Sequence, residues 1–414
     1  MSRPQAKSWD IFCRIVDNFG DIGICWRLSQ QLANEHSLQV RLFIDDLSIA
    51  SKIIIGLNNA QQSQTINNVE ICPWSESDTA IHPANIVIET FGCELPDVYV
   101  QQMSAQHIQP KKTIWVNLEY LSAENWVSDF HAKPSRHPTL PIIKHFFFPG
   151  FCHDTGGLIR EASLIAERDA FLSSQTMQDE FWQKLNAKKN TNTVSIRISL
   201  FYYPQAPVNN LLLALKKLKK QIDIYLPFNA NITTPNATLT DFKLILGQDL
   251  HTENLTIHPI PFLSQKDYDR LLWSCDLNFV RGEDSWIRAI WAGKPFIWQP
   301  YIQTDETHIK KLNAFLDVYT KEASPEVKST LYQTHLAWSE DTKSNSQFEL
   351  SQLPLTESEP DKAEPFKTGL WQDLINHLPA LQAYAIGRTK AFATQPDLAT
   401  KLVIFSENLA GNKV

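Results

Sequence analysis

Glycine is the residue that this sequence most clearly lacks. Thirteen of the 414 residues are glycine, about 3% against an average near 7%. The shortage excludes collagen-like chains, glycine-rich linkers and Arg-Gly-Gly segments of RNA-binding proteins. Three short windows, 17–23, 150–157 and 282–293, nevertheless hold seven of the thirteen. We therefore expect these windows to mark turns or close backbone approaches that need glycine.

Three other features are also missing. Lys and Arg number 38 against 45 Asp and Glu, a net charge of -7, which argues against broad nucleic-acid binding. No run approaches the roughly 18 apolar residues that span a membrane, and the first residues lack a signal-peptide core. The six cysteines form no Cys-x-x-Cys pair, which disfavours a zinc cage or a thioredoxin motif. We expect a cytoplasmic protein with free thiols and neither a nucleic-acid nor a membrane partner.

The length indicates two domains, each of an α/β type. At about 150 residues per domain, two is the simplest division. Strand and helix signals alternate through the first 150 residues and then again afterwards, which is typical of parallel sheets. Two such units in tandem form a cleft, the usual place for a ligand. The expected strands are 9–16, 38–44, 85–91, 112–121, 193–203, 222–226, 242–246, 255–262, 277–280 and 295–298.

Helical periodicity supplies the other elements. The segment 339–365 is rich in Ser, Glu, Asp, Thr and Pro, so we expect an exposed, mobile insertion there. The expected helices are 24–36, 168–187, 209–220, 264–275, 285–292, 371–386 and 399–408.

The first chemical motif is the acidic loop 17–23, which follows the first expected strand and opens a helix. It is not the Gly-x-Gly-x-x-Gly dinucleotide fingerprint, and Asp17 and Asp21 would repel a pyrophosphate. Two carboxylates four residues apart, beside Gly20 and Gly23, fit a site that handles a cation or a proton. The alternative is a capped turn with Asp21 as the helix N-cap.

The second motif is 280–288, which also follows a strand and opens a helix. The free N–H groups of a first helical turn, together with Gly282, make an anion cradle, and Arg281 can add a bidentate clamp on phosphate. The alternative is simple capping, because Glu283 and Asp284 are favourable near a helix N-terminus without any ligand.

A set of aromatic residues follows the expected strands of the second unit. Such rings can sandwich a nucleobase while an amide reads its edge, although residues of this kind are more often core. The set comprises Phe201, Tyr203, Phe262 and Tyr301, with Gln265 beyond Phe262.

Two further patterns carry less weight. Asp267-Tyr268-Asp269 looks like the Asp-x-Asp metal motif of sugar transferases, but Ser264 stands three residues before Asp267. That spacing predicts a helix capping pair instead. The histidines show no His-Glu-x-x-His spacing, so a zinc enzyme is not expected. The lysines of 216–220 are interpreted as a solvated helix face.

Taken in order, these motifs resemble those of the EarP family of bacterial protein-arginine rhamnosyltransferases. The resemblance covers roughly residues 9–320. It rests on 17–23 with Cys25-Trp26-Arg27, on Asn117-Leu118-Glu119-Tyr120-Leu121-Ser122-Ala123-Glu124, on 147–151 running into 155–158, and on 281–285 with 291–295.

The resemblance implies a GT-B fold of two Rossmann-like domains facing each other across a cleft. It implies inverting transfer of L-rhamnose from dTDP-β-L-rhamnose to an arginine of translation elongation factor P, with no cofactor and no metal. Residues 1–165 would form the acceptor-binding domain, with a helix at about 397–414 packing back on it. Residues 166–396 would bind the nucleotide sugar.

The resemblance also assigns roles to individual residues. Asp21 would be the general base, with Asp17 and Glu283 as further essential carboxylates. The nucleotide-sugar shell would consist of Phe19, Gly20, Phe201, Tyr203, Phe262, Gln265, Arg281, Gly282, Asp284, Ser285 and Tyr301. Tyr202 stands next to Tyr203 and could take its place.

Two alternatives stay open at this point. One is another GT-B sugar-nucleotide enzyme, either an epimerase or a transferase with a small acceptor, which has less need of paired acids. The other is a non-catalytic nucleotide-binding protein associated with translation, which the presence of Asp17, Asp21 and Glu283 together disfavours.

Overall fold

The computed structural model describes residues 7–17, 19–75, 82–107, 113–185, 195–228, 245–303, 306–339 and 365–411. The chain divides into two compact units. Unit 1 is Met1–Leu164 with Phe392–Val414, and unit 2 is Ile165–Ala391. From the sequence, the boundaries between the domains are expected at 165/166 and at 396/397. Which unit binds which substrate stays a prediction.

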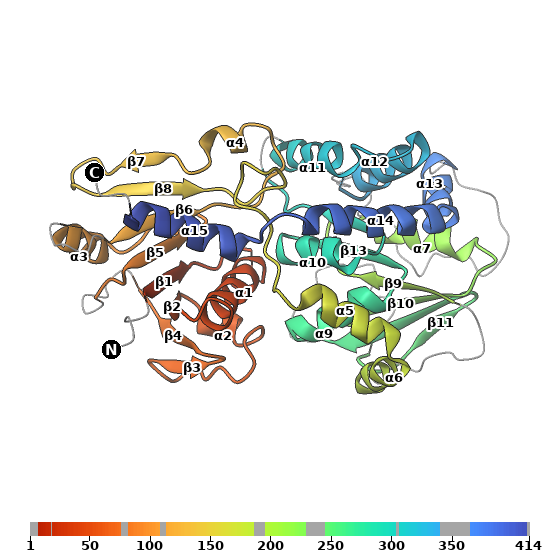
Figure 1. Cartoon of the computed structure of the whole chain (residues 1–414). Helices are drawn as coiled ribbons and strands as arrows, with labels where there is room; N and C mark the ends of the chain where they lie inside the picture. The colour runs from red at the N-terminus through yellow and green to blue at the C-terminus, as the bar shows by residue number, and fades with distance from the viewer. Residues whose placement is uncertain are drawn as a thin grey trace. The chain divides into compact units, whose positions relative to one another are not determined.

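Unit 1 is built on an eight-stranded sheet of order β3-β4-β2-β1-β5-β6-β8-β7. Its pairs are parallel except β3 with β4 and β7 with β8, at the two edges. Helices α1 and α15 contact each other, α1 against β1 and β2, and α15 against β6 (Figure 1). The elements are β1 (Ser8–Cys13), α1 (Gly20–Asn34), β2 (Gln39–Ile44), α2 (Leu47–Ala50), β3 (Gln64–Ile66), β4 (Val69–Pro73), β5 (Ile86–Thr90), α3 (Asp97–His107), β6 (Ile114–Leu118), α4 (Val127–Phe130), β7 (Pro134–Arg136), β8 (Ile143–Phe147) and α15 (Leu398–Gly411).

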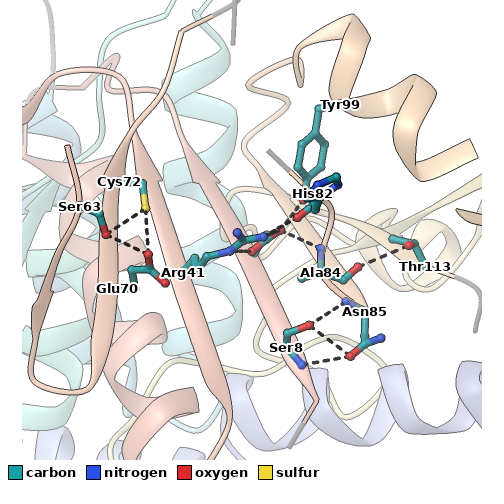
Figure 2. A network of polar contacts seen from close by, with 11 residues as sticks. Ser8, Arg41, Ser63, Glu70, Cys72, His82, Ala84, Asn85, Tyr99 and Thr113 are labelled. Carbon is teal, nitrogen blue, oxygen red and sulfur yellow. Dashed lines mark hydrogen bonds and ion pairs between the residues drawn. The ribbon is translucent and has the colours of Figure 1, made fainter. Parts of the chain in front are cut away.

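An ion pair with a buried carboxylate ties the strands of unit 1 together in the first half of β1. The carboxylate of Asp10 is fully buried. It accepts two hydrogen bonds from Arg41 on β2, at 2.7 and 2.8 Å, one from the Ala84 N–H at 2.9 Å and one from the Tyr99 hydroxyl at 2.5 Å. Figure 2 shows these donors together, with Ser8 beside them. Because the negative charge is fully partnered, the network serves the fold.

Unit 2 is built on a six-stranded sheet of order β11-β12-β10-β9-β13-β14, parallel except for β11 at its edge. Helices α9 and α10 contact each other. The elements are α5 (Leu164–Ser173), α6 (Gln175–Lys184), β9 (Ile196–Leu200), α7 (Val208–Lys216), β10 (Ile222–Phe228), β11 (Leu250–Thr252), β12 (Leu255–Pro261), α9 (Gln265–Ser274), β13 (Leu277–Arg281), α10 (Asp284–Ala292), β14 (Phe296–Gln299), α11 (Thr307–Tyr319), α12 (Pro325–Ser339), α13 (Pro365–Asn376) and α14 (Leu378–Ala393).

Both sheets reverse their strand order beside their first strand. In unit 1, β2 follows on one side of β1 and β5 on the other. In unit 2, β10 and β13 flank β9 in the same way. Ligands of open α/β sheets bind beyond the carboxyl ends of the strands at such a reversal. The fold therefore singles out the segments that follow β1 and β5, and those that follow β9 and β13.

Several expected elements differ from the structure. The helix expected over 168–187 is two helices, because the hydroxyl of Ser174 accepts the N–H of Met177 and caps α6. The helix expected over 371–386 is likewise split, between α13 and α14. Of the strand expected over 242–246, residues 245 and 246 are not in a strand and 242–244 lie outside the described residues. The insertion expected over 339–365 also lies outside them, apart from its two end residues.

The structure also bears on the expectations for the cysteines and for membrane-spanning segments. All six cysteines are free thiols. Among the described residues, no helix is long and apolar enough to cross a membrane.

Candidate functional site

The acidic loop lies where β1 ends and α1 begins. Strand β1 stops at Cys13, three residues before the expected end, and α1 begins at Gly20. Asp17 is half-buried in the connection, and Asp21 occupies the first turn of α1 with only 2% of its surface exposed. The loop thus lies at the reversal point of the unit 1 sheet.

Asp21 does not cap its own helix, so the capped-turn interpretation is wrong. The N-cap of α1 is Phe19. One oxygen of Asp21, Oδ2, instead accepts the N–H groups of Val16 and Asp17, both at 2.8 Å. The other oxygen, Oδ1, accepts the hydroxyl of Tyr120 at 3.2 Å. The side chain therefore reaches back from the helix and fixes the loop before it.

The Asp21 carboxyl is a buried acid that has no cationic partner within the described parts of the chain. Burial raises its pKa, against the opposing effect of its three hydrogen-bond donors, and the nearby charge of Asp45 adds to the rise. Among the described residues, no Lys, Arg or His forms an ion pair with it. A carboxylate with a raised pKa is a better proton acceptor than an ordinary aspartate.

Gly20 has a definite reason to be glycine. A Cβ atom at this position would lie 2.9 Å from Oδ2 of Asp17, which is too close for an unstrained contact. The Gly20 N–H also donates to the carbonyl of Asp17 at 2.8 Å. The absence of a side chain at residue 20 therefore lets the Asp17 carboxylate fold over the start of α1.

In unit 2, Arg281 ends β13 and lies against two aromatic rings that follow β9. Its guanidinium carbon is 4.4 Å from the ring centroid of Phe201 and 4.6 Å from that of Tyr203. Both are cation–π distances. The ring of Tyr301, half exposed, meets Tyr203 edge to face at 5.7 Å. The rings of Phe201 and Tyr203 therefore hold the guanidinium, a role not considered in the nucleobase interpretation.

The structure distinguishes Tyr203 from its neighbour Tyr202. The ring of Tyr202 contacts Trp338 of α12, whereas Tyr203 contacts Arg281. The N–H of Tyr203 donates to the side chain of Gln299 at 2.8 Å, which fixes the backbone at this point. Tyr203 is therefore the tyrosine that belongs with Arg281.

The turn from β13 to α10 is shaped around Arg281. Gly282 has a φ of +62°, a left-handed conformation that favours glycine. The hydroxyl of Ser285 accepts the Arg281 N–H at 3.2 Å and donates to the Arg281 carbonyl. Helix α10 begins at Asp284, and the N-cap Glu283 makes no side-chain capping bond. Glu283 therefore does not cap α10 by a side-chain hydrogen bond, although both Glu283 and Asp284 lie at the start of the helix, where its dipole favours acidic residues.

The remaining predicted residues lie in both units, and a hydrogen bond joins two of them. Asp284 accepts the side-chain amide of Gln265 at 3.2 Å, which joins the first turns of α9 and α10. Phe262 directly follows β12 and is half-buried. Phe19 and Gly20, predicted for the nucleotide-sugar shell, lie in unit 1 between Asp17 and Asp21 in the sequence.

The Asp-x-Asp pattern has a structural explanation, and the predicted capping pair is confirmed. Ser264 caps α9 by accepting the N–H of Asp267. Asp267 pairs with Lys184 at 2.6 Å and with Arg270 at 3.1 Å. Asp269 forms a buried two-bond pair with Arg288, at 2.8 and 2.7 Å. Across the described parts of the chain, no cluster of three or more His, Cys, Asp or Glu has metal-site geometry.

Sequence reasoning missed Tyr120 as a site residue, although it lies in one of the motifs that carry the resemblance. Its hydroxyl reaches Asp21, 99 residues earlier in the chain. Its ring stacks on Phe91 with centroids 4.2 Å apart and planes 10° apart. A polar aromatic residue directly after an expected strand is the signal that was available.

Two Rossmann-like units, each with its chemically distinctive residues at the reversal point of its sheet, form the GT-B fold that glycosyltransferases have. A glycosyltransferase from Rickettsia africae has the same fold, with a TM-score of 0.50 at 10% identity, covering 99% of this chain and 100% of that one. A second solved structure, described as the structural basis for EarP-mediated arginine glycosylation of translation elongation factor EF-P, has a TM-score of 0.64 at 32% identity. It covers 97% of this chain and 99% of that one.

The sequence comparison defines the family. Residues 9–407 match the family described as Elongation-Factor P (EF-P) rhamnosyltransferase EarP. The protein-arginine rhamnosyltransferase of Pseudomonas putida is 39% identical over 405 residues, covering 98% of this chain and 100% of the relative. The chain belongs to the EarP family.

Proposed function

We propose that this chain transfers L-rhamnose from dTDP-β-L-rhamnose to one arginine side chain of translation elongation factor P, with inversion at the anomeric carbon. Membership of the EarP family and the activity named for its relatives support the reaction class. The observation that carries the proposal is the buried Asp21 carboxyl, which has no cationic partner among the described residues. A cationic acceptor supplies the partner that the described residues do not offer.

Unit 1 is the acceptor side in this proposal. The acceptor guanidinium carries a positive charge, with a pKa above about 12. Asp17, before α1, and Asp21, in its first turn, offer two carboxylates. They orient the guanidinium, and Asp21 takes its proton. Glu283 is a third essential carboxylate, on unit 2.

Unit 2 is the donor side. Arg281 and the N–H groups at the start of α10 neutralise the diphosphate. Gly282 and Ser285 fix the backbone around Arg281. The nucleotide-sugar shell is completed by the aromatic residues after β9 and β12, by Tyr301, and by Gln265 with Asp284. Donor and acceptor are the substrates, and no cofactor enters the reaction.

The difficult step is removal of the proton. Taking it from a guanidinium to an ordinary carboxylate in the ground state spans about eight pKa units, or roughly 11 kcal/mol. Early deprotonation is therefore excluded. The arginine nitrogen attacks the anomeric carbon while the bond from that carbon to the diphosphate oxygen breaks. Bond formation makes the nitrogen acidic, and Asp21 accepts the proton late.

The charges balance over this sequence of events. The departing dTDP carries the electron pair of the broken bond, and its charge is stabilised by Arg281 and the first turn of α10. The proton goes to Asp21, and from there to solvent after product release.

A direct test is the intact mass of purified elongation factor P after incubation with the enzyme and dTDP-rhamnose. The expected result is addition of one deoxyhexose, located on an arginine by fragmentation. The Asp21→Asn variant is the matched control, with the same fold and no addition. An unmodified acceptor with the wild-type enzyme would refute the proposed function.

A further inference from the structure

Tyr120 lies close to the predicted base because of the strand order of the unit 1 sheet. Strand β6 ends at Leu118 and lies beside β5, which in turn pairs with β1. Tyr120 follows β6 by two residues and is half-buried. Its hydroxyl donates to Oδ1 of Asp21 at 3.2 Å. Residues far apart in the sequence therefore meet at the reversal point of the sheet.

Phe91 supports the Tyr120 ring and has an unusual backbone conformation. It follows β5 directly, with a φ of +56°, in the left-handed region that bulky residues rarely adopt. Its N–H donates to the carbonyl of Leu118 at 2.7 Å, which ties it to the end of β6. In this conformation its ring stacks on Tyr120. Strained residues of this kind persist where the surrounding structure fixes them, often at functional sites.

The two oxygens of Asp21 are not equivalent. Oδ2 already accepts two backbone N–H groups, from Val16 and Asp17. A carboxylate oxygen has about two acceptor positions, so Oδ2 is filled. Among the described residues, Oδ1 accepts a hydrogen bond only from the Tyr120 hydroxyl, which leaves one acceptor position. The direction of that position depends on where Tyr120 holds the oxygen.

A second Tyr–Asp contact in the same unit shows what differs here. Tyr99 also donates to a buried aspartate, Asp10, but that carboxylate is neutralised by Arg41. Among the described residues, the charged or titratable groups that act on Asp21 include no cation. The carboxyl of Asp45 raises the pKa of Asp21, and the Tyr120 hydroxyl lowers it. The charge of Asp21 in turn raises the pKa of the Cys13 thiol. Asp17 adjoins Asp21 through its N–H.

We propose that Tyr120, held in place by Phe91, is a positioning residue that directs the remaining lone pair of Asp21 Oδ1 toward the proton of the acceptor arginine. The inference rests on the proposed function, because it concerns the base of that reaction. Tyr120 acts through Asp21, as the hydrogen-bond donor to its Oδ1.

The decisive variant is Tyr120→Phe, which removes the hydroxyl and keeps the ring that stacks on Phe91. Losing a donor destabilises the Asp21 carboxylate, so the pKa of Asp21 rises. The base works in its ionised form, so the acidic limb of the kcat/KM profile moves to higher pH, by about 0.5 to 1 unit. We expect kcat at neutral pH to fall about tenfold through misorientation of the base. Affinity for dTDP-rhamnose stays unchanged.

The carboxyl group can also be followed without any turnover. Aspartate labelled with ¹³C at the side-chain carboxyl reports the pKa of Asp21 by NMR titration, with Asp21→Asn identifying its signal. Tyr332→Phe is the matched control, because Tyr332 donates to Asp317 at 2.5 Å in unit 2. It should leave both the Asp21 titration and the kinetics as in wild type. Phe91→Leu should shift both in the direction of Tyr120→Phe, by a smaller amount.

The outcomes separate this inference from the proposed function. A raised Asp21 pKa and a shifted acidic limb in Tyr120→Phe support the inference. A wild-type titration in that variant overturns it, even if activity falls, because the hydroxyl would then act elsewhere. If the wild-type enzyme transfers no rhamnose, the proposed function fails, and the NMR titration still reports whether Tyr120 controls Asp21.

Discussion

The two units place opposite charges at the same position of the same topology. Where the strand order reverses beside β1, unit 1 presents two carboxylates in the loop that opens α1. Where it reverses beside β9, unit 2 presents the guanidinium of Arg281 between aromatic residues and the start of α10. The sheet thus determines where a site can form, and the side chains determine its chemistry.

The same comparison separates the charges of the candidate site from structural ones. In the pairs Asp10 with Arg41 and Asp269 with Arg288, the carboxylate is buried and each charge has its counter-charge. Among the described residues, neither Asp21 nor Arg281 has an ion-pair partner: the first is held by N–H and hydroxyl donors, the second by rings. Charges held in place without neutralisation remain able to act on a substrate.

Removal of the unit 1 charge should have the largest effect. Asp21→Asn keeps the size of the side chain and removes the base, so turnover should fall about 10²- to 10⁴-fold. Affinity for dTDP-rhamnose, measured by calorimetry, should be within about twofold of wild type. Turnover near the wild-type rate would refute the assignment of the base, and lost donor binding with intact chemistry at saturation would make Asp21 a binding residue.

Removal of the unit 2 charge should affect the donor instead. Arg281→Ala removes a charged donor to phosphate, which is expected to weaken binding of dTDP-rhamnose about 10- to 100-fold. Arg270→Ala, another arginine of unit 2 and half-buried on α9, is the matched control and should bind normally. An unchanged dissociation constant for Arg281→Ala would contradict the diphosphate clamp.

The aromatic residues of unit 2 allow a finer test. If Phe201 holds Arg281, Phe201→Leu should weaken dTDP binding about three- to tenfold, in line with a cation–π contact. Thymidine, which has no diphosphate, should bind this variant as it binds the wild type. Equal losses for thymidine and dTDP would instead support the nucleobase stacking expected from the sequence.

The smallest effect should be on stability. The folded-state pKa of Asp21 is raised by burial, so its contribution to folding is most favourable below the unfolded pKa of about 3.9 and is lost as the pH rises through the folded value. At pH 7 the buried charge therefore costs free energy. Asp21→Asn should raise the melting temperature by about 1 to 3 °C at pH 7, and the gain should vanish near pH 3. A lower melting temperature at pH 7 would show that the carboxylate stabilises the fold.

Local patterns predicted where much of the candidate site lies in the fold, because a strand followed by a glycine-containing turn and a helix is visible over ten residues. The places of Asp17 and Arg281 follow from such patterns. Such patterns do not distinguish Tyr202 from Tyr203. Strand β9 ends at Leu200, so the alternation of side chains along a strand no longer determines the direction of either ring. The contact between Tyr120 and Asp21 depends on β5 lying between β1 and β6, which is a property of the whole sheet.

Local signals also failed where one residue interrupts a continuous pattern. The periodicity over 168–187 favours one helix, but the hydroxyl of Ser174 competes for the backbone and starts a new helix. Asp21 was a reasonable N-cap by residue type, yet its side chain bonds to the two preceding N–H groups of the loop instead. In both cases a short polar side chain can form hydrogen bonds with either of two nearby sets of backbone groups. Residue type alone does not determine which of them it binds.

The division of labour between the units can be measured by hydrogen–deuterium exchange with dTDP, which lacks the sugar and the acceptor. The account predicts slower exchange in peptides covering 199–203 and 281–287, and unchanged exchange in peptides covering 15–24. Protection of 15–24 without protection of 281–287 would contradict it, because the nucleotide would then bind beside the carboxylates.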